Sequence, residues 1–279
     1  MLMTTVMGSP CAYDLKAPET PVDTLVFVHG WMLSQEYWGP LMDALCDRYR
    51  CVSYDLTGFG QSRGPLGSRQ DYSLQAYAKD LLHLLDHLGI ESAWLVGHSL
   101  GGSIALWAAD YAPDRIKGVI ALNAGGGIYI QKAFEQFRSA GEKMLKFRPS
   151  WLRYAPLLGR LMGRMAVHQP MGPIWGRQRL ADFLDADGAA ARESLLSSTT
   201  ESEVHQLPQV VARMQQPLHF ITGEYDRIME PCYARHLASF HPDFPSNEAM
   251  VTELPRCGHM AMVEQTALVA EQIQLCLMI

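Results

Sequence analysis

A serine set among glycines, in GHSLGG (Gly97–Gly102), is the first candidate for chemistry in this sequence. The pattern G-x-S-x-G follows the apolar run AWLVGH and precedes a segment of helical periodicity. We therefore expect a sharp strand-to-helix turn with Ser99 at its tip. An ordinary turn capped by a serine would need only one glycine, whereas several small residues let the helix pack closely on the strand. The pattern predicts that Ser99 is a nucleophile.

A serine hydroxyl is a weak nucleophile, so it needs a histidine as base and a carboxylate to orient that histidine. His259 has the expected setting, in a loop between the last predicted strand and the final predicted helix. In GEYDRIMEP, Asp226 is the preferred acid and Glu224 the alternative, because Glu224 stands where the turn begins. Five other histidines lie on a helix face, within a strand or in the middle of the chain, and are more typical of structural or solvated groups: His83, His87, His168, His205 and His219.

An acyl-transfer reaction also needs backbone N–H groups near the substrate oxygen on which negative charge develops. In FVHGWM, Gly30 lets the chain turn after a strand, which leaves the N–H of Trp31 free to point toward the serine. The N–H of Leu100, at the start of the helix after Ser99, is the second predicted donor. This chemistry requires no cofactor and no metal.

The elements that must position these residues alternate along the chain. Short, β-branched-rich runs predict strands over residues 24–30, 51–55, 93–98, 118–124, 218–223 and 249–255. Apolar periodicity predicts helices over 36–47, 73–88, 100–111 and 261–277. Such alternation predicts an α/β fold with a doubly wound, mostly parallel sheet.

The alternation stops in the middle of the chain. Residues 125–209 contain no convincing strand, and prolines break their helical pattern, so we expect a helical cap inserted into a core of residues 1–124 and 210–279.

Charge is distributed unevenly along the chain. Residues 128–180 hold ten lysines and arginines against two glutamates, a net charge of +8, while the remainder of the chain carries −14. This asymmetry calls for a physical reason.

The cap segment PLLGRLMGRM (Pro156–Met165) is amphipathic and basic. At about 100° per residue, Arg160 and Arg164 fall opposite an arc of Leu158, Leu161, Met162 and Met165. Two interpretations stay open. The arc packs on the core and leaves the arginines solvated, or the basic cap rests on an anionic membrane and its apolar side lines a route for a lipophilic substrate.

The composition excludes several classes of protein. A chain of 279 residues that is 48% hydrophobic and 19% charged can bury a large core. The net charge of −6 is too acidic for a nucleic-acid binder, and no apolar run approaches the roughly 18 residues of a membrane span. The six scattered cysteines predict reduced thiols and a cytoplasmic location. The sequence carries no signal of oligomeric state.

The motifs together resemble the α/β-hydrolase family along nearly the whole chain. The residues that carry the resemblance are HGW (29–31), DLTGFGQS (55–62), GHSLGG (97–102), GEYDRIMEP (223–231) and GHMAMVE (258–264). The resemblance implies a triad of Ser99, Asp226 and His259, an oxyanion hole at Trp31 and Leu100, a cap over Gly125–Gln209, and a structural role for Asp55. Haloalkane dehalogenases and epoxide hydrolases would carry aspartate in place of Ser99, whereas Trp31 also fits cofactor-free haloperoxidases.

A narrower resemblance rests on LNAGGGIYI and ESEVHQLPQVV, which flank the cap. Both are similar to segments of hydrolases from photosynthetic organisms, including chlorophyll dephytylases, which cleave the phytyl ester of chlorophyll. The resemblance implies a serine carboxylic-ester hydrolase for a lipophilic ester, in the cytoplasm or peripheral to a thylakoid membrane. The alternatives are a thioesterase, lyase or C–C hydrolase with the same triad, a haloperoxidase-like enzyme, and a non-catalytic ligand-binding protein.

Overall fold

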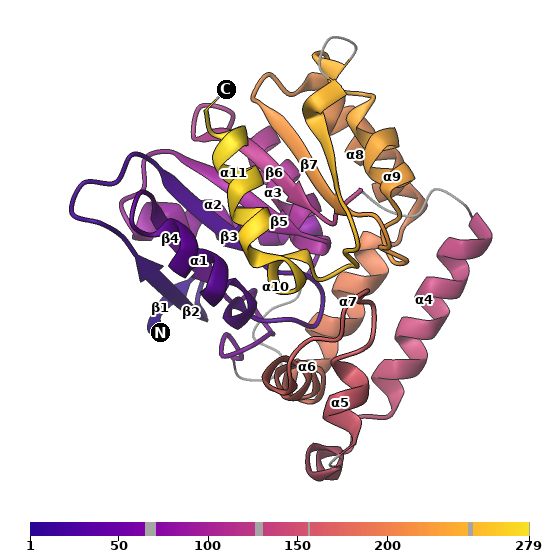
Figure 1. The fold of residues 1–279 in the computed structure, drawn as a ribbon. Coiled ribbons are helices and arrows are strands. Elements are labelled where there is room, and N and C mark those ends of the chain that lie inside the picture. The colour runs from indigo at the N-terminus through magenta and orange to yellow at the C-terminus, as the bar shows by residue number, and fades with distance from the viewer. Residues whose placement is uncertain (65–70, 126–130, 156, 245–247, 279) are drawn as a thin grey trace.

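A twisted sheet of eight strands forms the centre of the molecule (Figure 1). The computed structural model describes the chain except for residues 65–70, 126–130, 156, 245–247 and 279. The strand order is β1-β2-β4-β3-β5-β6-β7-β8. The strands are β1 (Leu2–Val6), β2 (Ser9–Lys16), β3 (Thr24–Val28), β4 (Arg50–Tyr54), β5 (Ala93–His98), β6 (Ile116–Leu122), β7 (Leu218–Gly223) and β8 (Val251–Leu254).

Parallel pairing of β4, β3, β5, β6, β7 and β8 confirms the predicted doubly wound sheet. The inner strands β5 and β7 are buried at every residue, as expected of strands covered on both faces. Their carboxyl ends all meet at one edge of the sheet, where ligands bind in folds of this kind. The residues that follow β3, β5, β6 and β7 are therefore brought together.

An antiparallel hairpin at the start of the chain was not predicted. β1 pairs with β2 and β2 with β4, both antiparallel. Four of the five residues of β1 are exposed or half-buried, because this strand lies at the edge of the sheet. A strand with so little apolar burial leaves no clear hydrophobic pattern in the sequence.

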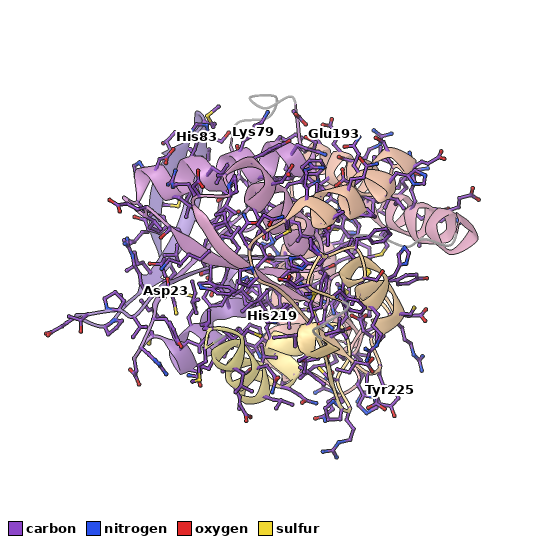
Figure 2. The ribbon with its side chains drawn as sticks, turned by 90° about the horizontal axis from the view of Figure 1, so that it is seen from above. Asp23, Lys79, His83, Glu193, His219 and Tyr225 are labelled. Carbon is purple, nitrogen blue, oxygen red and sulfur yellow. The ribbon has the colours of Figure 1, made fainter. Side chains whose placement is uncertain are left out.

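Helices cover both faces of the sheet. Figure 2 shows α2, which carries Lys79 and His83, on one face and the yellow α11 on the other. Two separate apolar clusters fill the spaces between the sheet and these two layers. The core helices are α1 (Gly39–Leu45), after the 3-10 turn η1 (Gln35–Trp38), α2 (Leu74–His87), α3 (Leu100–Tyr111), α9 (Pro231–Ala238), α10 (Ala261–Glu264) and α11 (Thr266–Cys276), with the 3-10 turn η4 (Glu248–Met250) before β8.

Helix starts and stops follow local chemistry. The hydroxyl of Ser73 accepts a hydrogen bond from the N–H of Ala76 at 3.2 Å, which makes it the N-cap expected for α2. Two predicted helices are each divided: residues 36–47 into η1 and α1, and residues 261–277 into α10 and α11. The second helix breaks at Gln265, whose φ of −141° is extended rather than helical.

Helices α4 to α7 of the mid-chain segment gather beyond the carboxyl edge of the sheet, in the lower part of Figure 1, whereas α8 lies beside α9 against the core. No strand occurs between 131 and 209 in the part of the chain that the structure describes. The predicted division at residue 209 falls inside α8, so this helix belongs partly to each predicted unit. The elements are α4 (Gln131–Lys146), the 3-10 turn η2 (Ser150–Tyr154), α5 (Leu158–Met162), α6 (Pro173–Asp185), α7 (Gly188–Ser198) and α8 (Glu201–Arg213).

Candidate active site

Ser99 stands at the junction of β5 and α3 in a strained conformation. Its φ of 52° and ψ of −117° lie in a region that side chains other than glycine rarely adopt. Such strain costs roughly 1–3 kcal/mol and persists only where the surrounding fold imposes it. The N–H of Ser99 is held by the carbonyl of Leu122 at 3.0 Å, and the side chain is half-buried. This is the geometry expected of a nucleophile elbow.

Two glycines beside Ser99 are required by close backbone approach. A Cβ on Gly97 would lie 2.3 Å from the carbonyl oxygen of Gly101, and one on Gly101 would lie 2.2 Å from that of Val28. No side chain fits at either position without moving backbone. The glycines of GHSLGG thus let α3 start directly against β3 and β5, as the sequence predicts.

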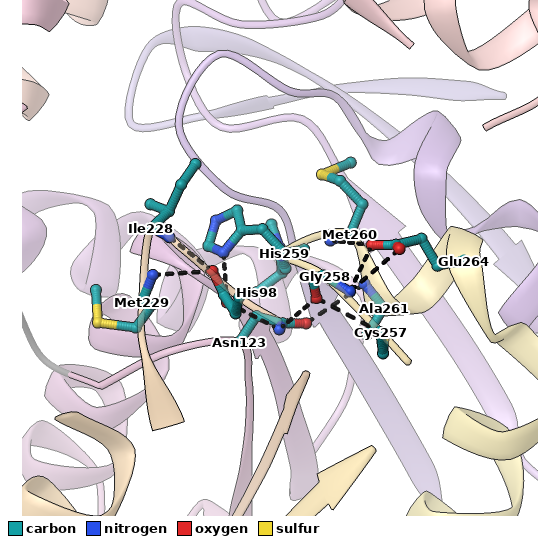
Figure 3. Close-up of polar contacts among 11 residues, drawn as sticks. His98, Asn123, Ile228, Met229, Cys257, Gly258, His259, Met260, Ala261 and Glu264 are labelled. Atoms are coloured by element: carbon teal, nitrogen blue, oxygen red, sulfur yellow. Dashed lines mark hydrogen bonds and ion pairs between the residues drawn. The ribbon is translucent and has the colours of Figure 1, made fainter. Parts of the chain in front are cut away.

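Asp226 and His259 come together although 33 residues separate them. Oδ2 of Asp226 accepts a hydrogen bond from Nδ1 of His259 at 2.7 Å, and both side chains are buried. The N–H groups of Ile228 and Met229 each donate to Oδ1 of Asp226 at 2.9 Å (Figure 3). Burial alone would raise the pKa of Asp226, but His259 and these N–H groups hold it below its ordinary value. The carboxylate therefore stays charged and favours the His259 tautomer that carries its proton on Nδ1.

Asn123, which follows β6, completes this arrangement. Its Nδ2 donates to Oδ2 of Asp226 and to the carbonyl of Gly258, both at 3.0 Å. One amide thus links the acid to the loop that carries the histidine. The sequence signal for Asn123 is its place directly after β6, at the same edge of the sheet as Ser99.

His98 connects the nucleophile turn to the histidine loop. Its Nε2 donates to the carbonyl of His259 at 2.7 Å, and the two imidazole rings lie 4.8 Å apart. Burial, followed by the neighbouring His259, lowers the pKa of His98 to about 3, so this ring is neutral. A Cβ on Gly30 would lie 2.7 Å from Nδ1 of His98 and 3.2 Å from Cβ of Ser99. His98 therefore packs between the Gly30 turn, Ser99 and His259, a role that the sequence pattern did not reveal.

The two predicted oxyanion donors lie at the ends of neighbouring strands. Trp31 follows the turn after β3, and Leu100 is the first residue of α3. Within the described ranges, neither backbone N–H donates a hydrogen bond to the protein. Two unused N–H groups beside Ser99 are suited to bind a negatively charged oxygen.

The Trp31 side chain joins the site to the cap. Its indole N–H donates to the carbonyl of Ala191 in α7 at 2.8 Å. A Cβ on Gly141 in α4 would lie 3.4 Å from the Trp31 ring. One residue therefore offers its backbone to the site and its side chain to the cap.

Asp55 and His29 are structural. Both oxygens of Asp55 are occupied, because the N–H groups of Gln35 and Gln61 donate to them at 2.7 Å. Burial raises the pKa of Asp55 to about 6. The His29 ring bonds the Gly30 carbonyl at 2.8 Å and the Leu56 N–H at 2.9 Å, and burial lowers its pKa to about 4. These groups hold turns and are not placed for acid–base chemistry.

Glu224 is directed away from His259. It is exposed, and Oε2 accepts a hydrogen bond from the N–H of Arg256 at 2.9 Å. The structure thus separates the two carboxylates that the sequence offered as acids and places Asp226 beside the histidine.

Glu264, another group that the sequence pattern did not single out, holds the histidine loop. One carboxylate oxygen accepts from the N–H groups of Gly258 and Met260 at 3.1 Å (Figure 3). The other accepts from the N–H groups of His168 and Gln169 of the cap at 2.8 and 3.1 Å. Through these four N–H groups, the carboxylate ties the loop around His259 to the cap.

Groups of three or more histidine, cysteine, aspartate or glutamate side chains that could hold a metal are absent from the described part of the chain. All six cysteines are free thiols. Among the helices that the structure describes, none is long and apolar enough to cross a membrane.

The family assignment follows from the sequence itself. Residues 23–266 match the family model described as alpha/beta hydrolase fold, which spans every residue of the site. This chain belongs to the α/β-hydrolase fold family. The eight-stranded sheet and the turn at Ser99 are consistent with that membership.

Relatives extend over most of this α/β hydrolase. An uncharacterized hydrolase, YugF of Bacillus subtilis, is 28% identical over 261 residues, which cover 90% of this chain and 88% of YugF. The structure of a thermophilic esterase from Thermogutta terrifontis matches 99% of this chain and 97% of its own with a TM-score of 0.76 and 22% identity. The structure of a putative lipase from Acinetobacter baumannii matches with a TM-score of 0.82 and 19% identity. The match covers 99% of this chain and 90% of the lipase chain. The structural matches show the shared fold, and the family together with its relatives places the protein among hydrolases.

Proposed function

We propose that this protein is a serine carboxylic-ester hydrolase. The observation that carries the proposal is the convergence of Ser99, held at a φ of 52°, with the Asp226–His259 pair at the same edge of the sheet. His98 links Ser99 to His259. It directly precedes Ser99 in the chain, and its Nε2 donates to the His259 carbonyl at 2.7 Å. A strained backbone at Ser99 and a buried Asp226–His259 pair at the same edge of the sheet are features typical of a catalytic centre.

The reaction follows from the roles of these groups. Oγ of Ser99 attacks the ester carbonyl carbon while Nε2 of His259 takes the hydroxyl proton. The N–H groups of Trp31 and Leu100 stabilise the oxyanion, and Asp226 stabilises the imidazolium that forms. His259 then gives its proton to the departing alkoxide, which leaves as the alcohol. Water, deprotonated by His259, attacks the acyl carbon. The bond from this carbon to Oγ then breaks, His259 returns the proton to Oγ of Ser99, and the carboxylic acid leaves.

The substrate that we favour is a lipophilic ester, and the specific candidate is the phytyl ester of chlorophyll. Its support is the apolar, basic cap above the site and the similarity of ESEVHQLPQVV, which forms most of α8, to chlorophyll dephytylases. The similar segment LNAGGGIYI runs into residues 126–130, which lie outside the described residues. The putative lipase of the same fold acts, by its name, on lipids, and this is compatible with the proposal.

A substrate panel tests the proposal. Purified protein and its Ser99→Ala variant are assayed with short-chain and long-chain p-nitrophenyl esters, chlorophyll, an acyl thioester and a dienoate. We expect hydrolysis of esters with preference for the long chain, release of chlorophyllide and phytol from chlorophyll, and loss of both activities in the variant. Activity that survives in Ser99→Ala would overturn the mechanism, and preference for the thioester or the dienoate would replace the ester assignment.

A further inference from the structure

Large apolar side chains lie exposed at the end of the cap that is farthest from the sheet. They are Phe147, Trp151, Tyr154, Leu157 and Leu161, with exposed fractions of 65%, 60%, 84%, 70% and 59%. We call these five residues the cap tip. They lie between the end of α4 and the end of α5, and Figure 1 shows α5 with α6 and α7 between it and the sheet. Exposed apolar patches on soluble domains mark surfaces that bind something.

Packing within the cap fixes this orientation. A Cβ on Gly176 of α6 would lie 2.1 Å from the carbonyl oxygen of Gly159 in α5, so the two helices touch backbone to backbone. Met162 of α5 is buried, while Leu161 is 59% exposed. The α5 helix thus has an inner face that is already in use. Its outer apolar residues have no core left to join, in contrast to the interpretation in which the whole arc packs inward.

Cations surround the cap tip. Arg160 and Arg164 are exposed and form no ion pair within the part of the chain that the structure describes. Arg153 pairs with Asp185, and Arg148 donates to the carbonyls of Phe183 and Ala186. From Arg138 to Arg179 the chain holds nine arginines and lysines against one glutamate, Glu142. The apolar surface therefore lies in a segment of net positive charge.

We propose that the cap tip binds the surface of an anionic lipid bilayer. Tryptophan and tyrosine side chains favour the boundary between head groups and acyl chains, and leucine and phenylalanine gain by leaving water there. Arginines at the same depth attract anionic head groups, and each cation near the surface strengthens binding about fivefold at low salt. An anionic bilayer offers an apolar layer beneath a negatively charged surface, which matches exposed apolar residues beside Arg160 and Arg164. This inference names where the proposed enzyme meets a lipophilic ester, and its biological purpose rests on that function.

The binding is tested with the full chain carrying Ser99→Ala, so that no substrate turnover interferes. Flotation with vesicles of phosphatidylcholine and phosphatidylglycerol in equal parts is compared with flotation on phosphatidylcholine alone. We expect binding to the anionic vesicles only, and weaker binding as salt rises. Trp151→Ser combined with Leu157→Ser should lower the affinity roughly tenfold or more, because both side chains would lose apolar burial in the bilayer boundary.

Charge is tested separately from apolar contact. Arg160→Gln combined with Arg164→Gln should lower affinity and flatten its dependence on salt. Arg48→Gln combined with Lys79→Gln removes the same charge from exposed positions outside the cap and should leave binding unchanged. Val22→Ser combined with Met278→Ser, which alters residues that are 65% and 63% exposed, is the apolar control.

Three outcomes would overturn the inference. The first is that the protein does not bind anionic vesicles at low salt. The second is that Trp151→Ser combined with Leu157→Ser binds them as tightly as the unmodified protein. The third is that sedimentation shows a dimer which this double substitution abolishes, although the substituted protein still binds vesicles. The last would show that a second copy of the chain covers this surface. Hydrolysis of a water-soluble short-chain ester by the variants with Ser99 intact provides an independent check, because it should remain at the level of the unmodified protein. If the unmodified protein did not hydrolyse this ester, the result would count against the proposed function and not against vesicle binding.

Discussion

The side-chain amide of Asn123 donates to the same oxygen of Asp226 that faces Nδ1 of His259. The distances are 3.0 Å from the amide nitrogen and 2.7 Å from the imidazole nitrogen. Because Asn123 also bonds the Gly258 carbonyl, one neutral side chain sets the position of the acid relative to the histidine. Asparagine suits this place because it tolerates the φ of 48° that the turn after β6 requires.

Asn123→Asp should shift the pH dependence of catalysis. The change places a second carboxylate about 3 Å from Asp226, and two carboxylates at that distance raise one of their pKa values. We expect the acid limb of the kcat/KM profile to move to higher pH and the rate at neutral pH to fall roughly 10-fold to 100-fold. Asn123→Ala removes the amide without adding charge, so it should lower activity while moving the acid limb much less. Equal profiles for the two variants would show that Asn123 has only a packing role.

Glu264→Gln should loosen the loop that carries His259. The carboxylate accepts hydrogen bonds from four backbone N–H groups, whereas a side-chain amide can accept hydrogen bonds only at its oxygen. We expect the free energy of unfolding to fall by about 1–3 kcal/mol. Because a displacement of about 1 Å of a catalytic group can cost about 100-fold, kcat should also fall, with KM little changed.

Glu271→Gln, on the exposed side of α11, is the matched control for charge. It should change neither quantity. If Glu264→Gln instead raised KM and left kcat intact, the residue would act on substrate binding through the cap.

The contact between the core and α6 should depend on pH through Asp182. This buried carboxylate accepts from Ser34 at 3.2 Å and from Gln178 at 3.0 Å, and burial raises its pKa to about 7. A carboxyl with a raised pKa binds its proton more tightly in the folded chain than in the unfolded chain. Stability from this group is therefore present at low pH and is lost as pH rises from about 4 to about 7.

Urea unfolding of Asp182→Asn checks this sign. The stability of the variant relative to the unmodified protein should increase across that pH window, by up to about 1.4 kcal/mol per pH unit. Asp47→Asn, at an exposed position, should show no such trend. A relative stability of Asp182→Asn that falls with pH would show that the carboxylate is favoured in the folded protein.

Much of the fold and of the candidate site could be predicted from motifs that combine a residue type with a fixed local context. The strand–turn–helix around Ser99 and the buried parallel strands could be predicted because short sequence patterns determine them. The joining of Asp226 to His259 could be predicted because each follows a strand of the same parallel sheet. Whether these groups catalyse remains a prediction for experiment.

Other parts of the site could not be read from the sequence. His98 bonds a carbonyl that is 161 residues away, and Glu264 bonds two N–H groups of the cap that are 96 and 95 residues away. Nothing in the residue types marks such contacts. The β1–β2 hairpin lies at an exposed edge and has little apolar pattern. The outward orientation of Leu161 depends on the glycine contact between α5 and α6, which is a property of two helices and not of one.

Reaction of the intact protein with a fluorophosphonate, followed by mass analysis of its peptides, shows whether Ser99 is the nucleophile. We expect a single modification on Ser99, strongly slowed in His259→Ala and absent in Ser99→Ala. Labelling of another residue, or no labelling by a protein that still hydrolyses esters, would contradict this role of Ser99.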